Sequence, residues 1–169
     1  ELDVATGKLT DITLRPAGGT AACDIVGYMP DEHSVLMVSD HKDGRARLYV
    51  RDLKKGTVRE PIAALSAFEL DGASIGDTRE LMVAVSNEDG YGVAHMYSLP
   101  DFKPLPAPMD EKGVISGSSF LGRTLVWSLS NARRPNMSFA TTYPADPKAK
   151  PSTRQLTWTE DQGIDFSAF

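Results

Sequence analysis

Residues 34–52 read SVLMVSDHKDGRARLYVRD, in which an apolar run ends at a serine and a polar turn leads to a second strand-like run. The same plan recurs at residues 81–99 (LMVAVSNEDGYGVAHMYSL) and at residues 125–143 (LVWSLSNARRPNMSFATTY). The serines that close the first runs are spaced 47 and then 44 residues apart, at Ser39, Ser86 and Ser130. Self-similarity at that period is typical of propeller blades and other stacked β-units.

Each of these stretches has the pattern of a β-hairpin. Short runs rich in valine, leucine, tyrosine and threonine are typical of strands, and 14 glycines with 11 prolines interrupt any helical period. Asp43-Gly44 and Asp89-Gly90 supply the backbone freedom that a tight turn needs. We expect a leading strand before each hairpin, at residues 21–28, 66–70 and 113–120. We expect a fourth strand after each hairpin, near residues 58–62, 103–108 and 154–158. Four antiparallel strands per unit describe a propeller blade.

The repeat also predicts how the chain is divided. Three whole blades are expected at residues 15–62, 63–108 and 109–158. Residues 1–14 are interpreted as the remnant of a preceding blade, because the turn at Asp3–Gly7 matches the one at Asp52–Gly56 and a strand at Lys8–Leu14 follows. Residues 159–169 are interpreted as an exit segment. The predicted fold is therefore all-β, a β-propeller fragment of about three four-stranded blades plus a remnant strand, with a sandwich of about a dozen strands as the alternative.

The composition argues against nucleic acid and membranes as partners of the chain. The chain is 41% hydrophobic and 24% charged, with a net charge of −5 and scattered basic residues, which argues against a nucleic-acid surface. No apolar run approaches the roughly 20 residues that cross a bilayer, so no membrane partner is expected. The single cysteine, Cys23, excludes an intrachain disulfide and leaves the compartment open between cytoplasmic and periplasmic or secreted.

Candidate catalytic and metal-binding groups are few. Gly117–Leu121 (GSSFL) approaches a G-x-S-x-G nucleophile elbow but lacks its last glycine and lies in an expected strand. His33 and His41 lie in turns, where we expect them exposed, whereas His95 lies in a strand, where we expect it packed or hydrogen-bonded. No residues have the spacing of a zinc site, and the acidic turns lack the calcium-loop pattern, so neither a metal nor a cofactor is expected.

Two arginines are the least ordinary polar residues in the chain. Arg133 and Arg134 are predicted to lie in the turn between the second and third strands of the last blade, residues 133–136. A guanidinium can hold a carboxylate through two parallel hydrogen bonds, so these are the candidate substrate-facing residues. The alternative is a solvated turn. Trp127 and Trp158 are interpreted as packing residues.

Several segments resemble a known family. Tyr28–Asp31 (YMPD) and Lys42–Leu53, with its D-G turn and LYVRDL strand, resemble the repeated core of certain propellers. Asn131–Pro135, Thr153–Thr157 and Gly163–Asp165 resemble the final blade and exit of the propeller in the prolyl oligopeptidase family, which includes dipeptidyl and acylaminoacyl peptidases. The second blade departs from the pattern, because it has LPDF where D-L-x-x-G is usual and its first turn lacks Pro-Asp.

The resemblance implies a role in a larger protein. In that family a seven- or eight-bladed propeller covers an α/β-hydrolase domain that begins just after such an exit. The chain would then be the non-catalytic lid that gates access of peptides to the hydrolase domain of the same parent chain, inactive by itself. The early motifs are shared with the propeller of the Tol system, so a binding propeller that acts as a scaffold for protein partners is the alternative.

An incomplete ring of blades has a physical consequence. Closure leaves a propeller with only short, protected strand edges, whereas three blades would leave apolar faces and edges open. Such surfaces pair with copies of themselves. Self-association of the chain is therefore expected.

Overall fold

The computed structural model describes residues 1–146, 148–159 and 163–164. In these residues twelve strands form three four-stranded antiparallel sheets, and strands that follow one another in sequence are neighbours in the sheet. Blade 1 contains β1 (Cys23–Tyr28), β2 (Ser34–Ser39), β3 (Arg47–Asp52) and β4 (Val58–Arg59). Blade 2 contains β5 (Glu69–Ile75), β6 (Leu81–Glu88), β7 (Tyr91–Ser98) and β8 (Lys103–Leu105). Blade 3 contains β9 (Val114–Leu121), β10 (Thr124–Asn131), β11 (Arg134–Thr142) and β12 (Ser152–Gln155).

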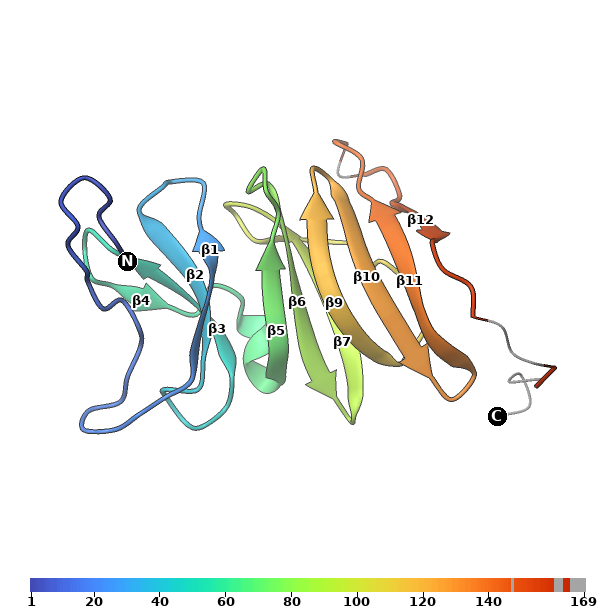
Figure 1. Cartoon of the computed structure of the whole chain (residues 1–169), viewed down its shortest axis with the longest axis horizontal. Helices are drawn as coiled ribbons and strands as arrows, with labels where there is room; N and C mark the ends of the chain where they lie inside the picture. Colours follow the sequence, from blue (N-terminus) through green and yellow to red (C-terminus); the bar gives the residue numbers. More distant parts are fainter. Residues whose placement is uncertain (147, 160–162, 165–169) are drawn as a thin grey trace.

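The blades stand side by side in chain order (Figure 1). This arrangement confirms the predicted all-β architecture of four-stranded antiparallel blades. The expected exit segment, residues 159–169, lies largely outside the described residues.

The core lies between the blades rather than within one sheet. Leu36, Val38 and Val50 of blade 1 belong to one buried cluster with Met82 and Tyr97 of blade 2. A second buried cluster joins blade 2 to blade 3, and its members are Leu81, Val83, Val85, Ala94, Met96, Leu125, Trp127, Leu129, Phe139 and Tyr143. All residues of β2 and the first six of β6 are buried, because apolar side chains cover both of their faces.

The third repeat, which contains β10, is offset by one residue from the spacing that the serines predicted. One backbone hydrogen bond occurs at the same place in each hairpin and can be used to align the blades. Its acceptors are the carbonyls of His33, Glu80 and Arg123, and its donors are the N–H groups of Leu53, Leu99 and Tyr143, in that order. Those carbonyls are 47 and then 43 residues apart. Leu129, and not Ser130, therefore takes the place of Ser39 and Ser86.

The physical reason is the two-residue period of a strand. Leu125, Trp127 and Leu129 are buried toward blade 2, so the intervening Val126 and Ser128 point away from it. We call that side, with the paired residues of β9 and β11, the outward face of blade 3. A shift of one residue places Ser130 on this face, half-buried, whereas Ser39 and Ser86 are fully buried.

Two expected strands are displaced. Residues 63–67 form a 3₁₀ turn in which the Ser66 hydroxyl donates to the Ala63 carbonyl at 2.8 Å, so the leading strand of blade 2 begins at Glu69 instead of Ser66. The fourth strand of blade 3 ends at Gln155, before the expected 158. Trp158 consequently is 76% exposed, and its predicted packing role is wrong. The same role is confirmed for Trp127, which is buried and stacked on Phe139 with ring centroids 5.1 Å apart.

The first fourteen residues reach the far side of blade 1 through their last few side chains, and the strand expected at Lys8–Leu14 does not form. Leu2 and Leu9 form an isolated antiparallel bridge. Ile12 and Leu14 then join a buried cluster with Val35, Met37 and Tyr49 of blade 1. Arg51 fixes this segment, because its guanidinium donates to the carbonyl oxygens of Ile12 at 3.0 Å and Thr13 at 3.2 Å.

Candidate functional site

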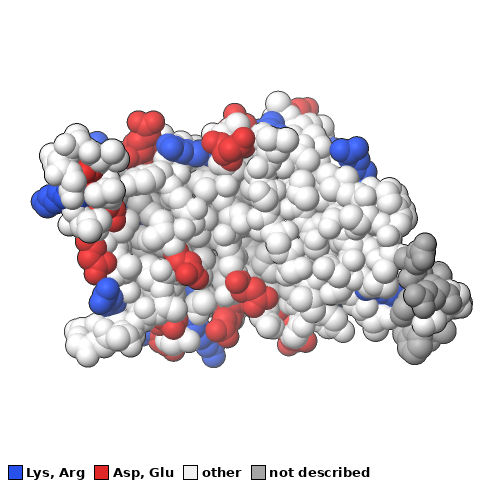
Figure 2. Space-filling model, in the orientation of Figure 1, with Lys and Arg blue, Asp and Glu red and all other residues white. Residues whose placement is uncertain are grey.

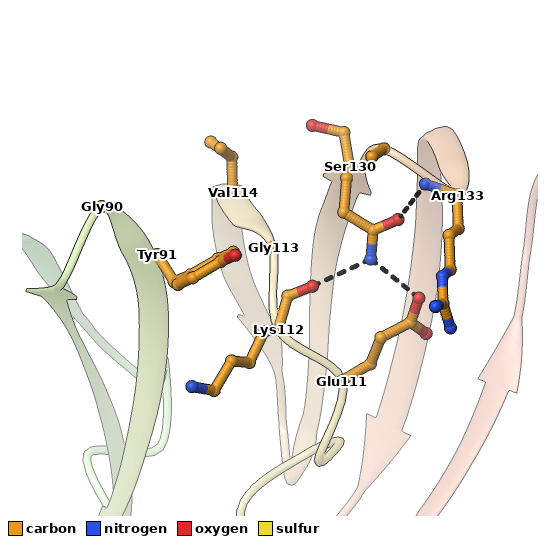
Figure 3. A pocket seen from close by; sticks show the side chains of 10 residues that line it. Gly90, Tyr91, Glu111, Lys112, Gly113, Val114, Ser130 and Arg133 are labelled. Atoms are coloured by element: carbon orange, nitrogen blue, oxygen red, sulfur yellow. Dashed lines mark hydrogen bonds between the residues drawn. The ribbon is translucent and has the colours of Figure 1, made fainter. Parts of the chain in front are cut away.

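A pocket of about 510 Å³ opens where β6 and β10 end, at the lower edge of the molecule as drawn in Figure 1. Three segments line it: the turn into β7, the connector that leads into β9, and the turn between β10 and β11. The lining residues are Gly90, Tyr91, Glu111, Lys112, Gly113, Val114, Ser130, Asn131, Ala132 and Arg133. Figure 3 shows Tyr91 and Arg133 on opposite sides of the pocket, with Lys112 and Glu111 below.

Two glycines bring blade 2 and blade 3 together at this pocket. The main-chain N–H of Gly92 donates to the Gly113 carbonyl at 2.8 Å, in an isolated antiparallel bridge. A Cβ added at Gly113 would lie 2.6 Å from both Leu129 Cδ1 and the Ser130 carbonyl oxygen, which is closer than atoms can pack. A Cβ at Gly92 would lie 3.0 Å from the Ile115 nitrogen. Glycine is therefore required at position 113 because the backbone of β10 passes so near.

A half-buried ion pair between Glu111 and Arg134 forms the floor of the pocket. Asn131 donates from Nδ2 to Glu111 Oε1 at 2.9 Å and to the Lys112 carbonyl at 2.8 Å (Figure 3). Arg134 completes the network, because its guanidinium contacts both oxygens of Glu111, at 3.2 Å and 3.1 Å. Partial burial by itself raises the pKa of Glu111, but hydrogen bonds from Asn131 and Arg134 and the nearby positive charges outweigh it. The pKa of Glu111 therefore lies below its ordinary value, and the carboxylate is ionised at neutral pH.

The remaining charges of the pocket are positive. Lys112 Nζ lies 5.4 Å from the ring centroid of Tyr91, a cation–π contact. Arg133 lines the other side, and its main-chain N–H donates to Asn131 Oδ1 at 2.9 Å. Glu111 is the carboxylate of the lining, and Arg134 already pairs with it. The lining therefore combines the positive charges of Lys112 and Arg133 with the negative charge of Glu111.

The two arginines singled out from the sequence have different positions. Arg133 lies in the turn, as predicted, and lines the pocket. Arg134 is the first residue of β11, because it pairs with Asn131 across a turn of two residues, Ala132 and Arg133. Its predicted place in a turn spanning 133–136 is therefore wrong. Held by Glu111, the Arg134 side chain orders the floor of the pocket.

Sequence reasoning missed the other pocket residues. Tyr91, Glu111 and Lys112 belong to no motif, and Asn131 enters only as the first residue of the segment Asn131–Pro135. The hydrogen bonds from Asn131 to Lys112 and Glu111 join residues 19 and 20 positions apart. The glycines at positions 92 and 113 were the available signal, since Gly113 begins an expected strand, where glycine is disfavoured, and Gly92 directly precedes one.

A serine, a histidine and a glutamate meet on blade 2 without the geometry of a hydrolytic triad. His95 Nε2 lies 2.8 Å from Ser86 Oγ and 3.0 Å from Glu88 Oε1, and the Ser86 hydroxyl also reaches Glu88 at 2.8 Å. In a triad the acid holds Nδ1 while Nε2 receives the serine proton. Here both partners share Nε2 and Ser86 is fully buried, so the group is structural. The expectation that His95 is packed or hydrogen-bonded is confirmed.

The other candidate groups also have structural roles. Ser118, in the incomplete elbow sequence, lies 2.9 Å from Ser74 Oγ and links β9 to β5. His33 is half-buried, with Nδ1 2.7 Å from the Asp31 carbonyl, and His41 packs against Tyr49 with centroids 4.5 Å apart. Both histidines are half-buried, so the expectation that they are exposed is wrong, because each imidazole folds back onto blade 1.

The acidic turns hold their own backbone. Asp43 Oδ1 accepts the Arg45 N–H at 3.3 Å, and Asn87 Oδ1 accepts the Gly90 N–H at 3.1 Å. Within residues 1–146, 148–159 and 163–164, no three side chains of the metal-binding types come together. In the face shown in Figure 2, lysines and arginines are scattered among acidic residues. None of the helices in the described ranges has the length and apolar character that crossing a membrane requires.

Comparisons with known proteins give a likeness of structure. No protein-family model matches the chain, and no curated protein does. Apo prolyl oligopeptidase B from Galerina marginata is similar with a TM-score of 0.66 and 16% identity, over 81% of this chain and 20% of that one. Its complex with a 35mer hydrolysis and macrocyclization substrate has the same TM-score, with 15% identity over 83% of this chain.

TolB from Acinetobacter baumannii is also similar, with a TM-score of 0.57 and 15% identity over 81% of this chain and 32% of that one. At such identities the likeness shows the fold alone, the β-propeller. The chain spans about a fifth (20%) of the length of the prolyl oligopeptidase chains it matches.

Proposed function

We propose that this chain is part of the non-catalytic propeller of a prolyl-oligopeptidase-type serine peptidase. The observation that carries the proposal is the similarity of its three blades to prolyl oligopeptidase B, at a TM-score of 0.66 over 83% of the chain. In this role the blades cap an α/β-hydrolase domain of the same parent protein and restrict its substrates to peptides that pass the lid. The chain alone is inactive.

The proposed role agrees with the chemistry of the described residues. In the grouping of Ser86, His95 and Glu88 described above, the serine is fully buried and the geometry is wrong for nucleophilic attack. In the candidate pocket, Glu111 is held by a hydrogen bond and Lys112 by a ring contact, so the lining is ordered. A lid needs such surfaces and no nucleophile.

Two measurements test the proposal. Purified chain incubated with fluorogenic proline-containing peptides is expected to release no product, and hydrolysis that survives repurification would contradict the inactive role. The reading frame that encodes this chain is expected to encode a hydrolase with a G-x-S-x-G elbow as well. A frame without a hydrolase would overturn the peptidase assignment.

The likeness to TolB supports a second candidate, a binding propeller that acts as a scaffold for protein partners. The reading frame separates the two, because a scaffold propeller has no need of an elbow serine.

A further inference from the structure

We propose that Met137 is a modification site, at which a hydroperoxide oxidises the thioether to a sulfoxide whose new oxygen is held by the side chains of Arg134 and Gln155. The inference goes beyond the proposed function and does not rest on it, because every residue that it uses belongs to this chain.

Two hydrogen-bond donors already point at the sulfur of Met137. Arg134 Nη1 lies 3.8 Å from Met137 Sδ, and Gln155 Nε2 lies 3.1 Å from it. Arg134 is the first residue of β11 and Gln155 is the last residue of β12, so the donors come from two neighbouring strands of blade 3 (Figure 1). A thioether sulfur is only a weak acceptor. Both donors therefore face a partner that satisfies them poorly.

Other contacts fix the orientation of both donors. Gln155 Nε2 also donates to the Thr157 carbonyl at 2.8 Å, and because a carbonyl only accepts, the amide must present its nitrogen on this side. The second hydrogen of that nitrogen is left for Met137. The Nε and Nη2 atoms of Arg134 contact Glu111 at 3.2 Å and 3.1 Å, so Nη1 is the nitrogen turned to the sulfur.

Oxidation would give these donors a better acceptor. A sulfoxide oxygen is strongly polar, and a bond to it from the permanently charged guanidinium of Arg134 is charge-assisted. Oxidation of a methionine ordinarily disrupts packing, because it makes an apolar side chain polar. At Met137 the polar product has partners in place, so the fold is expected to tolerate it.

Burial separates Met137 from most methionines of the chain. Four of the six methionines are at most 3% exposed, and they are Met29, Met37, Met82 and Met96. Met137 and Met109 are half-buried, which leaves them within reach of a small oxidant. No donor among the described residues contacts the sulfur of Met109, which packs against apolar side chains. Met109 is therefore an internal control for Met137.

The reaction balances with hydrogen peroxide as the oxidant. The Met137 sulfur attacks one oxygen of the peroxide, and a sulfur–oxygen bond forms as the oxygen–oxygen bond breaks. The departing oxygen takes the proton of the transferred oxygen and leaves as water. The sulfur is oxidised by two electrons and the peroxide is reduced. A methionine sulfoxide reductase reverses the modification.

The first test is the order in which the methionines react. The purified folded chain is treated with dilute hydrogen peroxide, then denatured, digested and analysed by mass spectrometry. We expect Met137 and Met109 to gain an oxygen before the four buried methionines do. A Met137 that reacts no faster than the buried methionines would overturn the proposal.

The second test is the handedness of the product, because a sulfoxide sulfur is chiral. Both donors approach the sulfur from fixed directions, so one epimer of the Met137 sulfoxide should form in about tenfold excess. Two reductases, each specific for one epimer, measure the ratio on the denatured oxidised chain. Equal epimers at Met137, or an excess as large at Met109, would show that the donors select nothing.

The third test removes a donor. Met109→Leu confines the reaction to Met137, and the thermal midpoint is then compared before and after oxidation, with and without Gln155→Leu. Oxidation should lower the midpoint by roughly 2–4 °C more in the chain with Gln155→Leu, the loss of about one hydrogen bond. Comparison of each variant with its own reduced form cancels the effect of the substitution itself.

Arg154→Leu is the matched control, because successive residues of a strand point to opposite faces and Arg154 directly precedes Gln155 on β12. It should respond to oxidation like the chain without it. The same response for Gln155→Leu as for Arg154→Leu would contradict the role of Gln155. Should Gln155→Leu not fold, Gln155→Asn shortens the amide and tests the same bond.

Discussion

Gly113 shows how a single residue can build the pocket. The Gly113 carbonyl accepts the bond that ties blade 2 to the connector, and its missing side chain lets β10 approach. Around it, Asn131 and Arg134 hold Glu111 in its ionised form. The site therefore depends on one close backbone approach and one ion pair.

Gly113→Ala is expected to destabilise the chain by about 1–3 kcal/mol, because the new methyl group would meet Leu129 and the Ser130 carbonyl at 2.6 Å. Urea unfolding followed by circular dichroism measures the change. Gly72→Ala is the matched control, since no atom lies within 4 Å of a Cβ at that position. A loss of stability for Gly72→Ala as large as for Gly113→Ala would contradict the close-approach explanation.

Glu111 predicts a pH dependence. Its pKa is lower in the folded chain than in the unfolded chain, because the bonds and charges of Asn131 and Arg134 outweigh the effect of burial. Its contribution to stability is thus fully present above the unfolded pKa, about 4.3, and is lost as pH falls through the folded pKa.

Glu111→Gln should therefore lower the free energy of unfolding by about 0.5–1 kcal/mol at pH 7, a value reduced for the partial exposure of the pair. The difference between the original chain and the variant should shrink as the pH is lowered from 7 to 3. Urea unfolding at both pH values measures it, and a difference that grows on acidification would contradict the lowered pKa.

At the scale of the element, β10 differs from β2 and β6 in having only one buried face. The strand is apolar on one face, and its outward face carries hydroxyl groups. Ser128 pairs with Ser138, and Thr124 with Thr142, each with hydroxyl oxygens 3.0 Å apart. By contrast β2 and β6 are buried on both faces. The repeat of strand and turn is therefore regular, while the face of each strand that is buried changes along the chain.

The corrected spacing can be tested at two adjacent residues. Leu129→Ala should cost about 2–5 kcal/mol, because Leu129 is fully buried between blades 2 and 3. Ser130→Ala should change the free energy of unfolding by less than about 0.5 kcal/mol, since it faces outward. Chemical denaturation of both variants measures the two losses of stability. A larger loss for Ser130→Ala than for Leu129→Ala would support the alignment of Ser130 with Ser39 and Ser86 instead.

At the scale of the whole molecule, two blade interfaces and the N-terminal cover hold the chain together. The outward face of blade 3 has no such cover among the described residues. Exposed aliphatic side chains lie on it, with Leu121 77%, Val114 57% and Val126 38% exposed. This face is where we propose that the expected self-association takes place.

Sedimentation equilibrium at tens of micromolar should show species larger than one chain, because apolar side chains on an open sheet face pair with other copies. Leu121→Lys combined with Val126→Lys should shift the equilibrium toward the single chain. Lys substitutions at the exposed Val4 and Leu9 are the control. A single chain at every concentration would contradict self-association, and an unchanged equilibrium in the blade 3 variant would contradict its location.

Local pattern was sufficient to predict the strands and hairpins, because alternation of apolar residues and Asp-Gly turns act within a few residues. The strand at residues 34–39 was predicted to the residue, and the hairpin turns at Asp43-Gly44 and Asp89-Gly90 are present. The errors arose where the local pattern is ambiguous, as at residues 66–70, where a 3₁₀ turn replaces the start of a strand.

Long-range packing determined which strand faces are buried and which residues meet at the pocket, and a local sequence pattern contains neither. Which face of β10 is buried depends on the neighbouring blade, and a one-residue shift reverses it, so three serines that look equivalent in sequence are not equivalent in space. The pocket likewise unites Tyr91, Lys112 and Arg133 from three separate segments through the contact of Gly92 with Gly113. Strands form from neighbours in sequence, whereas the pocket forms from neighbours in space.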